Sequence, residues 1–200
     1  MFELAADLPA ELVPLSWLLG VWEGTGVMAY RVGERPHDAE FGQRIAFTHD
    51  GGRRLAYSAT AWRLDDPDQR PYFAELGFWS LARSLGDADA GPGMLPATVE
   101  ARYTTADEVE TLRRADGAGF DIDVAIVQDG GVIELYLGTV NGPRVDLGTD
   151  AVVRSASAKD YAAATRMYGL VEGHLLWAWD IAALGQSLRT HASGRLARVD

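Results

Sequence analysis

Apolar and polar residues alternate along much of the chain, in short runs rich in β-branched and aromatic side chains. In one run, Ile122, Val124 and Ile126 share one parity, whereas Asp121 and Asp123 share the other. Such alternation is typical of a strand with one face buried and the other in water. The runs that predict strands are 41–48, 54–64, 72–82, 120–128, 132–140, 145–154, 165–171 and 175–181.

Turn signals separate these runs at intervals typical of antiparallel structure. They include Asp-Gly-Gly at 50–52 and 129–131, Asn-Gly-Pro at 141–143 and Glu-Gly at 172–173. Many short strands joined by such turns predict a sandwich or a barrel, and a barrel leaves no exposed sheet edge. We therefore expect an all-β fold: a single antiparallel β-barrel of about ten strands, wide enough for one ligand.

Two segments depart from the strand pattern. Residues 1–19 contain two prolines and a set of leucines before Gly20, which predicts a short helical cap over one end of the barrel. Residues 86–119 start with a run rich in Gly, Pro and Asp, and we interpret them as an insertion between barrel strands. After this loop, the segments 98–103 and 108–114 could form an extra hairpin or a short helix, and we expect the hairpin. Deletion of 87–94 should then cost little stability. The whole chain, 1–200, reads as one domain.

Composition narrows the possible functions. The chain has 200 residues, 48% of them hydrophobic, and no cysteine, which excludes disulfides, thiolate metal sites and a cysteine nucleophile. Its formal net charge of −11 opposes binding to nucleic acid and to anionic membrane surfaces. No apolar stretch is long enough to span a membrane and the first residues lack a signal-peptide pattern, so we expect a cytoplasmic protein.

His191 is the most informative candidate for chemistry. It lies in the run 188–199, which predicts the closing strand of the barrel. A histidine that reaches into a barrel is one of the few ways for a chain without cysteine to hold a heme iron. The alternative is a histidine on the surface or in the core that binds no metal and has its hydrogen bonds made by water or by the protein. The other histidines, His37, His49 and His174, fall in or beside loops and turns and should face water.

The phase of this strand raises a question. Strict alternation puts Arg189, Ser193 and Arg195 on the same face as His191, which is a polar lining for a heme. Either His191 lies near the barrel mouth, where an arginine could meet a heme propionate, or a bulge at Ser193–Gly194 changes the register.

The opposite end of the chain carries a second motif, G-x-W-x-G-x-G, formed by Gly20, Trp22, Gly24 and Gly26. An indole on the first strand can plug the closed end of a barrel while its N–H finds a partner, and Trp22 should be buried. The glycines permit the bend and the close backbone contacts of a tightly coiled strand. A G-x-W start is shared by lipocalins and their relatives, so the motif indicates a calycin-like barrel that holds a ligand.

The opening motif, the closing segment 185–191 and the segments 47–51 and 75–79 together resemble the nitrobindin family, heme proteins with a fatty-acid-binding-protein-like barrel. The resemblance implies one heme b per subunit with His191 as its axial iron ligand and catalytic residue. It implies nitric oxide binding and isomerisation of peroxynitrite to nitrate. It also implies that Lys159 lies near the heme, although a solvated turn lysine is an alternative interpretation.

With no second histidine opposite His191, we expect five-coordinate iron and an apolar distal side that lacks the acid–base pair of a peroxidase. The main alternative function is a non-enzymatic carrier of a fatty acid or similar apolar ligand. Its support is the pair Arg166 and Tyr168, which share a strand face and could grip a carboxylate. The sequence shows no serine-nucleophile motif and no phosphate loop, and a homodimer remains possible.

Overall fold

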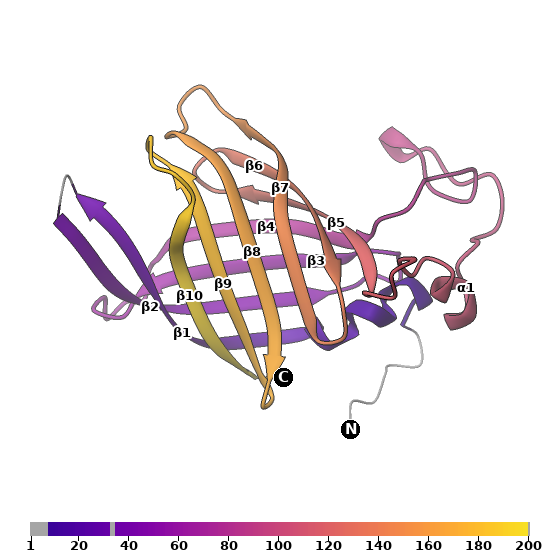
Figure 1. Ribbon diagram of the computed structural model, residues 1–200, viewed down its shortest axis with the longest axis horizontal. Helices are drawn as coiled ribbons and strands as arrows, with labels where there is room; N and C mark the ends of the chain where they lie inside the picture. The colour runs from indigo at the N-terminus through magenta and orange to yellow at the C-terminus, as the bar shows by residue number, and fades with distance from the viewer. Residues whose placement is uncertain (1–7, 33–34, 200) are drawn as a thin grey trace.

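The computed structural model describes residues 8–32 and 35–199, and these form a closed antiparallel barrel of ten strands (Figure 1). The strands follow one another around the barrel in chain order, and β1 pairs with both β2 and β10. This confirms the predicted fold class. The strands are β1 (Gly20–Val32), β2 (Arg35–Thr48), β3 (Leu55–Arg63), β4 (Pro71–Leu81), β5 (Phe120–Gln128), β6 (Val132–Val140), β7 (Arg144–Arg154), β8 (Tyr161–Val171), β9 (His174–Ala183) and β10 (Arg189–Arg198).

The glycines of the opening motif lie where the first and last strands meet. A Cβ on Gly24 would lie 2.3 Å from the carbonyl oxygen of Arg195, and one on Gly26 would lie 2.4 Å from the ring of Phe41. Both positions therefore require glycine for close contact rather than for flexibility. Trp22 is buried, as predicted, and its Nε1 donates a 2.8 Å hydrogen bond to the carbonyl of Leu18.

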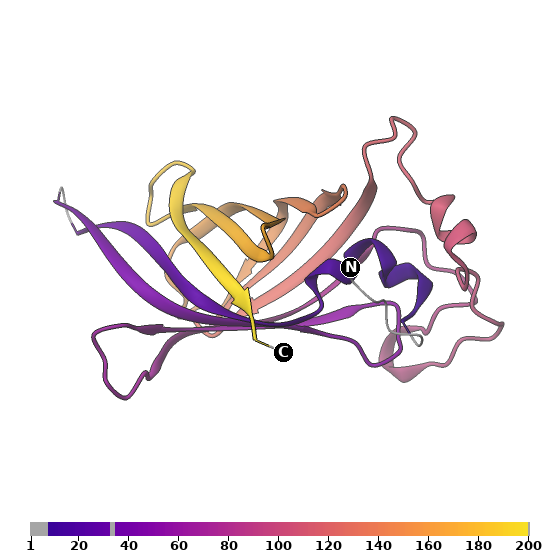
Figure 2. The ribbon, with the colours of Figure 1, turned by 90° about the horizontal axis from the view of Figure 1, so that it is seen from below.

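A short 3-10 helix, η1 (Ala10–Leu18), precedes β1 and covers the closed end of the barrel (Figure 2). Leu12, Leu15 and Leu18 are fully buried there and extend the apolar core out of the barrel. The predicted helical cap is thus present over 10–18. The part of the expected cap at 1–7 lies outside the described residues.

The segment between β4 and β5 lies outside the barrel wall, as expected, but the expected extra hairpin is wrong, and the alternative, a short helix near 108–114, is the one that forms. The segment instead holds a single 3-10 turn, η2 (Pro92–Met94), and a short helix, α1 (Ala106–Glu110). Thr105 and Glu108 form a reciprocal capping box at the start of α1, which explains why a helix forms here. Only one isolated bridge joins this segment to the sheet, between Arg113 and Phe120.

This segment is also tied to the core more firmly than its composition suggests. The guanidinium of Arg83, which is almost fully buried, bonds Asp89 at 2.7 and 2.8 Å and Glu11 of η1 at 2.8 and 2.9 Å. Val109 of α1 is buried as well. Sequence reasoning missed this ion cluster, so deletion of 87–94 would remove a buried partner of Arg83 rather than a free loop.

The barrel interior is divided along its axis. Toward η1 it is filled by large apolar side chains such as Trp22, Phe47, Trp79 and Ile122, all at most 1% exposed. Toward the other end the packing gives way to a cavity. Among the described residues, no helix is long and apolar enough to cross a membrane.

Candidate heme site

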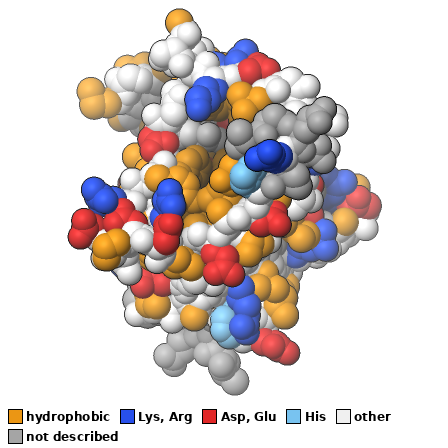
Figure 3. Space-filling model, turned by 90° about the vertical axis from the view of Figure 1, so that its left-hand side faces the viewer, with side chains coloured by type: hydrophobic (Ala, Val, Ile, Leu, Met, Phe, Trp, Pro, Cys, Tyr) orange, Lys and Arg blue, Asp and Glu red, His pale blue; other side chains and the backbone are white. Residues whose placement is uncertain are grey.

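The cavity opens at the end of the barrel opposite η1, and Figure 3 looks toward this end, where hydrophobic side chains line a hollow ringed by charged ones. Its empty space is about 870 Å³ when the open mouth is included. Phe41, Phe73, Trp177 and Trp179 make much of the wall. Volume and lining match those of small-molecule and cofactor sites in other proteins.

His191 lines this cavity from the beginning of β10. The pairing of β10 with β9 passes from Thr190 opposite Asp180 to Ala192 opposite Trp179, which leaves His191 as the extra residue of a bulge. The bulge therefore exists, but at His191 itself and not at Ser193–Gly194 as the sequence suggested. It lets His191 and Ala192, two consecutive residues, both line the cavity.

The His191 ring is held in a defined orientation. Its Nδ1 lies 3.2 Å from the carbonyl oxygen of Ala29 on β1, and its ring meets that of Trp179 edge to face at 5.6 Å. Because a carbonyl oxygen only accepts, Nδ1 carries the proton and Nε2 keeps a free lone pair. Burial lowers the pKa of His191, the hydrogen bond to the Ala29 carbonyl partly offsets this, and the nearby Arg189 lowers the pKa further, so the neutral ring is favoured at pH 7.

The remaining histidines do not reach the cavity. His37 is exposed and stacks on Tyr30, and neither His49 nor His174 is part of the cavity lining. Over residues 8–32 and 35–199, no group of three or more His, Asp or Glu side chains could hold a metal ion directly. His191 is thus the histidine in position to bind a metal carried by a cofactor.

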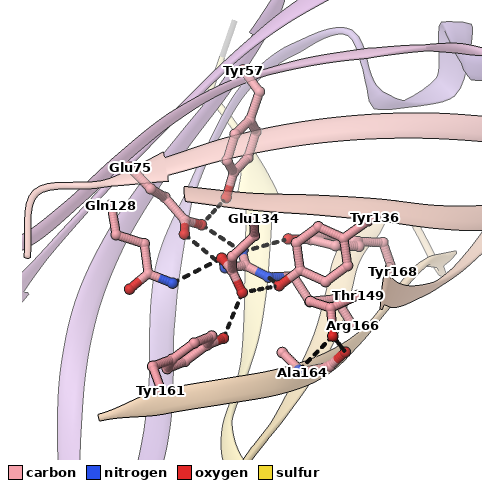
Figure 4. Close-up of polar contacts among 10 residues, drawn as sticks. All are labelled: Tyr57, Glu75, Gln128, Glu134, Tyr136, Thr149, Tyr161, Ala164, Arg166 and Tyr168. Atoms are coloured by element: carbon pink, nitrogen blue, oxygen red, sulfur yellow. Dashed lines mark hydrogen bonds and ion pairs between the residues drawn. The ribbon is translucent and has the colours of Figure 1, made fainter. Parts of the chain in front are cut away.

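The floor of the cavity is a buried polar cluster that the sequence analysis did not anticipate (Figure 4). Arg166 of β8 binds both carboxylate oxygens of Glu75 on β4, at 2.7 and 2.8 Å, and one oxygen of Glu134 on β6 at 3.2 Å. None of the three side chains is more than 3% exposed. Burial opposes the charge of Arg166, but the Glu75 carboxylate, with the neighbouring Tyr168 and Tyr136, holds its pKa well above the usual value.

Tyrosines and one amide complete this cluster. Tyr57 donates to Glu75 at 2.5 Å, Tyr136 and Tyr161 donate to one oxygen of Glu134 at 2.5 and 2.6 Å, and Gln128 donates to its other oxygen at 2.8 Å. Burial raises the pKa of all three tyrosines, so their hydroxyls stay protonated and act as donors. Each carboxylate oxygen has at least one donor, as a buried charge requires.

This floor corrects the expectation of a wholly apolar pocket without acid–base groups, because Glu75 and Arg166 both line the cavity. Glu134 shares its inward parity with Val132 and Tyr136, so alternation along 132–140 held a signal for it. Which strands bring their charges together depends on the closed barrel, and a one-dimensional pattern does not give that.

Arg166 and Tyr168 do share an inward face, as their spacing predicted, with Arg166 Nη1 3.5 Å from the Tyr168 hydroxyl. However, the guanidinium is already bound to Glu75 and Glu134. An incoming carboxylate would have to displace Glu75, which argues against the grip of a fatty-acid carrier.

The residues present fit a heme. The wall is aromatic, a neutral histidine presents a free ring nitrogen, and the iron of a heme needs only such a ligand from the protein. Three buried polar atoms of the lining, Gln43 Oε1, Trp177 Nε1 and Trp179 Nε1, have no hydrogen-bond partner among the described residues. Unpartnered polar atoms are uncommon in a pocket that stays empty.

The family model that describes a THAP4-like, heme-binding beta-barrel domain matches residues 11–198, which is nearly the whole chain. The chain belongs to this family. Heme is therefore the cofactor expected of this THAP4-like barrel.

Relatives of this THAP4-like barrel carry a more specific name. A peroxynitrite isomerase of Leifsonia xyli subsp. xyli is 64% identical over 200 residues, and one of Clavibacter michiganensis subsp. michiganensis is 62% identical, each match covering 100% of both chains. The crystal structure of Rv2717c from M. tuberculosis superposes with a TM-score of 0.67 at 22% identity, covering 99% of this chain and 100% of that one. At this identity the superposition supports the barrel fold alone.

Lys159 lies in the loop between β7 and β8 of this THAP4-like barrel. Its side chain is exposed and is not part of the cavity lining, while its backbone carbonyl accepts a 3.2 Å hydrogen bond from Arg154. These contacts agree with a solvated turn lysine. A contact of Lys159 with bound heme stays a prediction.

Proposed function

We propose that this protein is a heme-dependent peroxynitrite isomerase, with His191 as the axial ligand and the only protein ligand of a b-type heme iron. The relatives of that name, at more than 60% identity over both full chains, support the activity. The observation that carries the assignment to this site is the His191 ring, fixed through Nδ1 to Ala29 so that Nε2 is free at the wall of the aromatic cavity.

When bound, a ferric heme supplies a Lewis-acidic iron that promotes rearrangement of peroxynitrite to nitrate, with no atom or electron gained or lost. The chain's own residues prepare the place for it. The Ala29 carbonyl orients the imidazole and raises its donor strength, while Phe41, Phe73, Trp177 and Trp179 exclude water from the cavity. Arg189 at the start of β10 is the candidate partner for a propionate.

The same cavity suits nitric oxide, which is small and uncharged and needs no cationic anchor. A cytoplasmic location agrees with the composition and remains a prediction. No observation favours the carrier, since its candidate anchor Arg166 is neutralised by its own carboxylates.

The test is stopped-flow decay of peroxynitrite with nitrate yield as the second readout, using protein loaded with ferric heme and freed of excess. Wild type should accelerate the decay, and His191→Ala should return it to the uncatalysed rate. His174→Ala is the matched control, because that ring also contacts a backbone carbonyl through Nδ1, at 3.0 Å, but lies outside the cavity. Equal rates for wild type and His191→Ala would contradict the assignment.

A further inference from the structure

The buried polar cluster on the floor of the cavity does not balance its own charge (Figure 4). Arg166 contributes one positive charge, whereas Glu75 and Glu134 contribute one negative charge each. All four carboxylate oxygens accept hydrogen bonds from Arg166, from tyrosine hydroxyls or from Gln128, which is the bonding pattern of ionised carboxylates. One positive against two negative charges leaves the cluster with one negative charge in excess.

The neighbouring titratable groups do not compensate for this charge. The tyrosines of the cluster stay neutral, because burial raises the pKa of each hydroxyl. His191 at the mouth is neutral as well, since burial lowers its pKa. The charged side chains in the cavity lining are Arg166 and Glu75, and Glu134 lies directly behind them. A ligand that fills the cavity therefore meets one buried negative charge at its inner end.

The excess charge is kept away from water. Arg166, Glu75 and Glu134 have side chains that are at most 3% exposed, and the guanidinium carbon of Arg166 lies 4.3 Å from the centre of the Trp179 ring. Salt and solvent screen charges in such a place only weakly. An unbalanced buried charge is unfavourable unless an opposite charge lies near it. The cavity thus favours an occupant with positive charge at its centre over a neutral one.

We infer that Glu75 and Glu134 lower the reduction potential of the bound heme and thereby hold its iron in the ferric state. The inference rests on the proposed function, in which heme occupies this cavity. Ferric iron in the porphyrin dianion leaves one net positive charge and ferrous iron leaves none, so the excess negative charge of the floor stabilises the ferric form relative to the ferrous one. Ferric iron is also the Lewis acid that the proposed reaction needs.

The dimensions of the cavity set the expected size of the effect. A unit charge at about 10 Å, roughly the span of a cavity of about 870 Å³, changes an equilibrium between two charge states about tenfold at an effective dielectric constant of about 20. For a one-electron couple, a tenfold change corresponds to about 59 mV. Arg189 at the mouth has the opposite sign but is exposed, so water and salt screen its charge.

Spectroelectrochemical titration of the heme-loaded protein, followed at the Soret band in the absence of oxygen, tests the inference. Glu134→Gln removes one negative charge and keeps the shape of the side chain. Its amide oxygen can still accept from Tyr136 and Tyr161, and Gln128 can turn its own amide to accept from the new N–H₂ group. The midpoint potential should rise by about 59 mV, which is a tenfold shift toward ferrous iron at a fixed potential.

Two variants are matched controls, and both should have the wild-type potential. The double variant Gln128→Glu with Glu134→Gln exchanges the two partners of one 2.8 Å hydrogen bond and keeps the charge of the cluster. Glu23→Gln removes a carboxylate from the outer wall, where Glu23 pairs with Arg44, and changes the net charge of the chain by the same amount as Glu134→Gln. Its charge is exposed, so water and salt screen it from the cavity.

Circular dichroism checks that the barrel is intact, and Glu75→Gln, with the same expected shift, replaces Glu134→Gln if that variant does not fold or hold heme. A change of less than about twofold in the ferric-to-ferrous equilibrium would overturn the inference. So would an equal shift in the double variant, because packing and not charge would then set the potential. A wild type that binds heme without accelerating peroxynitrite decay contradicts only the proposed function, since the potentials still decide the inference.

Discussion

The mouth and the floor of the cavity are built on opposite principles. At the mouth, His191 lies on a bulge, is only partly buried and has one hydrogen bond to a backbone carbonyl. At the floor, Arg166 and Glu134 sit in regular strands, almost fully buried, and each has several charged or phenolic partners. The comparison indicates that the mouth is free to bind, while the floor is satisfied internally and holds the barrel together.

Removal of Arg166 should have the largest effect on stability. Arg166→Met keeps much of the side-chain length but leaves Glu75 and Glu134 buried without a cation, which should cost roughly 3–5 kcal/mol of unfolding free energy. Urea unfolding of the heme-free protein measures this. Arg144→Met, which breaks an exposed pair with Asp146, should leave the unfolding free energy close to that of wild type. Similar losses in the two variants would mean that the floor does not stabilise the fold.

Substitution of Asp89, which lies outside both the mouth and the floor of the cavity, should have an intermediate effect on stability. Asp89→Asn weakens two charged hydrogen bonds to the buried Arg83 and should cost about 1–3 kcal/mol at pH 7. The Arg83 guanidinium holds the pKa of Asp89 well below its usual range. The stabilisation is therefore complete above the unfolded pKa of about 3.9 and is lost as pH falls toward the folded value.

Thermal unfolding from pH 7 down to pH 3 checks this prediction. The gap in stability between wild type and Asp89→Asn should stay constant at neutral pH and narrow below about pH 4. A gap that widens in acid would contradict the ion cluster. A gap near zero at pH 7 would restore the original interpretation of 87–94 as a dispensable loop.

Substitution of Lys159 should have the smallest effect on heme affinity and on stability. Because its side chain is exposed and outside the cavity lining, Lys159→Ala should change heme affinity by less than about twofold and leave stability within about 0.5 kcal/mol. Titration with heme, followed at the Soret band, measures the affinity. A loss of tenfold or more would show that Lys159 contacts the bound heme, as the family resemblance implied.

The sequence pattern predicted the regular strands better than the irregular features, such as the bulge in β10 and the start of α1. The strands at 120–128 and 132–140 have the predicted bounds, since alternation is strict there and turn residues end each run. Of the two alternatives for His191, the place near the barrel mouth agrees with the structure, whereas the bulge was expected at Ser193–Gly194 and lies at His191, because the position of a bulge depends on the partner strand. The capping box of Thr105 and Glu108 was visible in the sequence as a helix start and was overlooked.

Of the two parts of the candidate site, the sequence predicted the mouth with His191 but not the polar floor. His191 stood out because its strand closes the barrel and because the chain has no cysteine to compete with it as an iron ligand. Glu75, Glu134 and Arg166 lie on three strands separated by 59 and 32 positions in the sequence, so only the closed barrel brings them together. Their partners, the tyrosines, look like ordinary core residues until the carboxylates are placed.

The most direct test of the difference between mouth and floor is to measure ferric heme affinity and heme-free stability together in His191→Ala. The dissociation constant for heme should rise by roughly 100-fold or more, because the ring is the one strong ligand that the cavity offers to iron. The unfolding free energy of the heme-free protein should stay within about 1 kcal/mol of wild type. Unchanged heme affinity with an intact Soret band would show that another residue holds the iron, and a large loss of stability would show that His191 belongs to the fold rather than to the site.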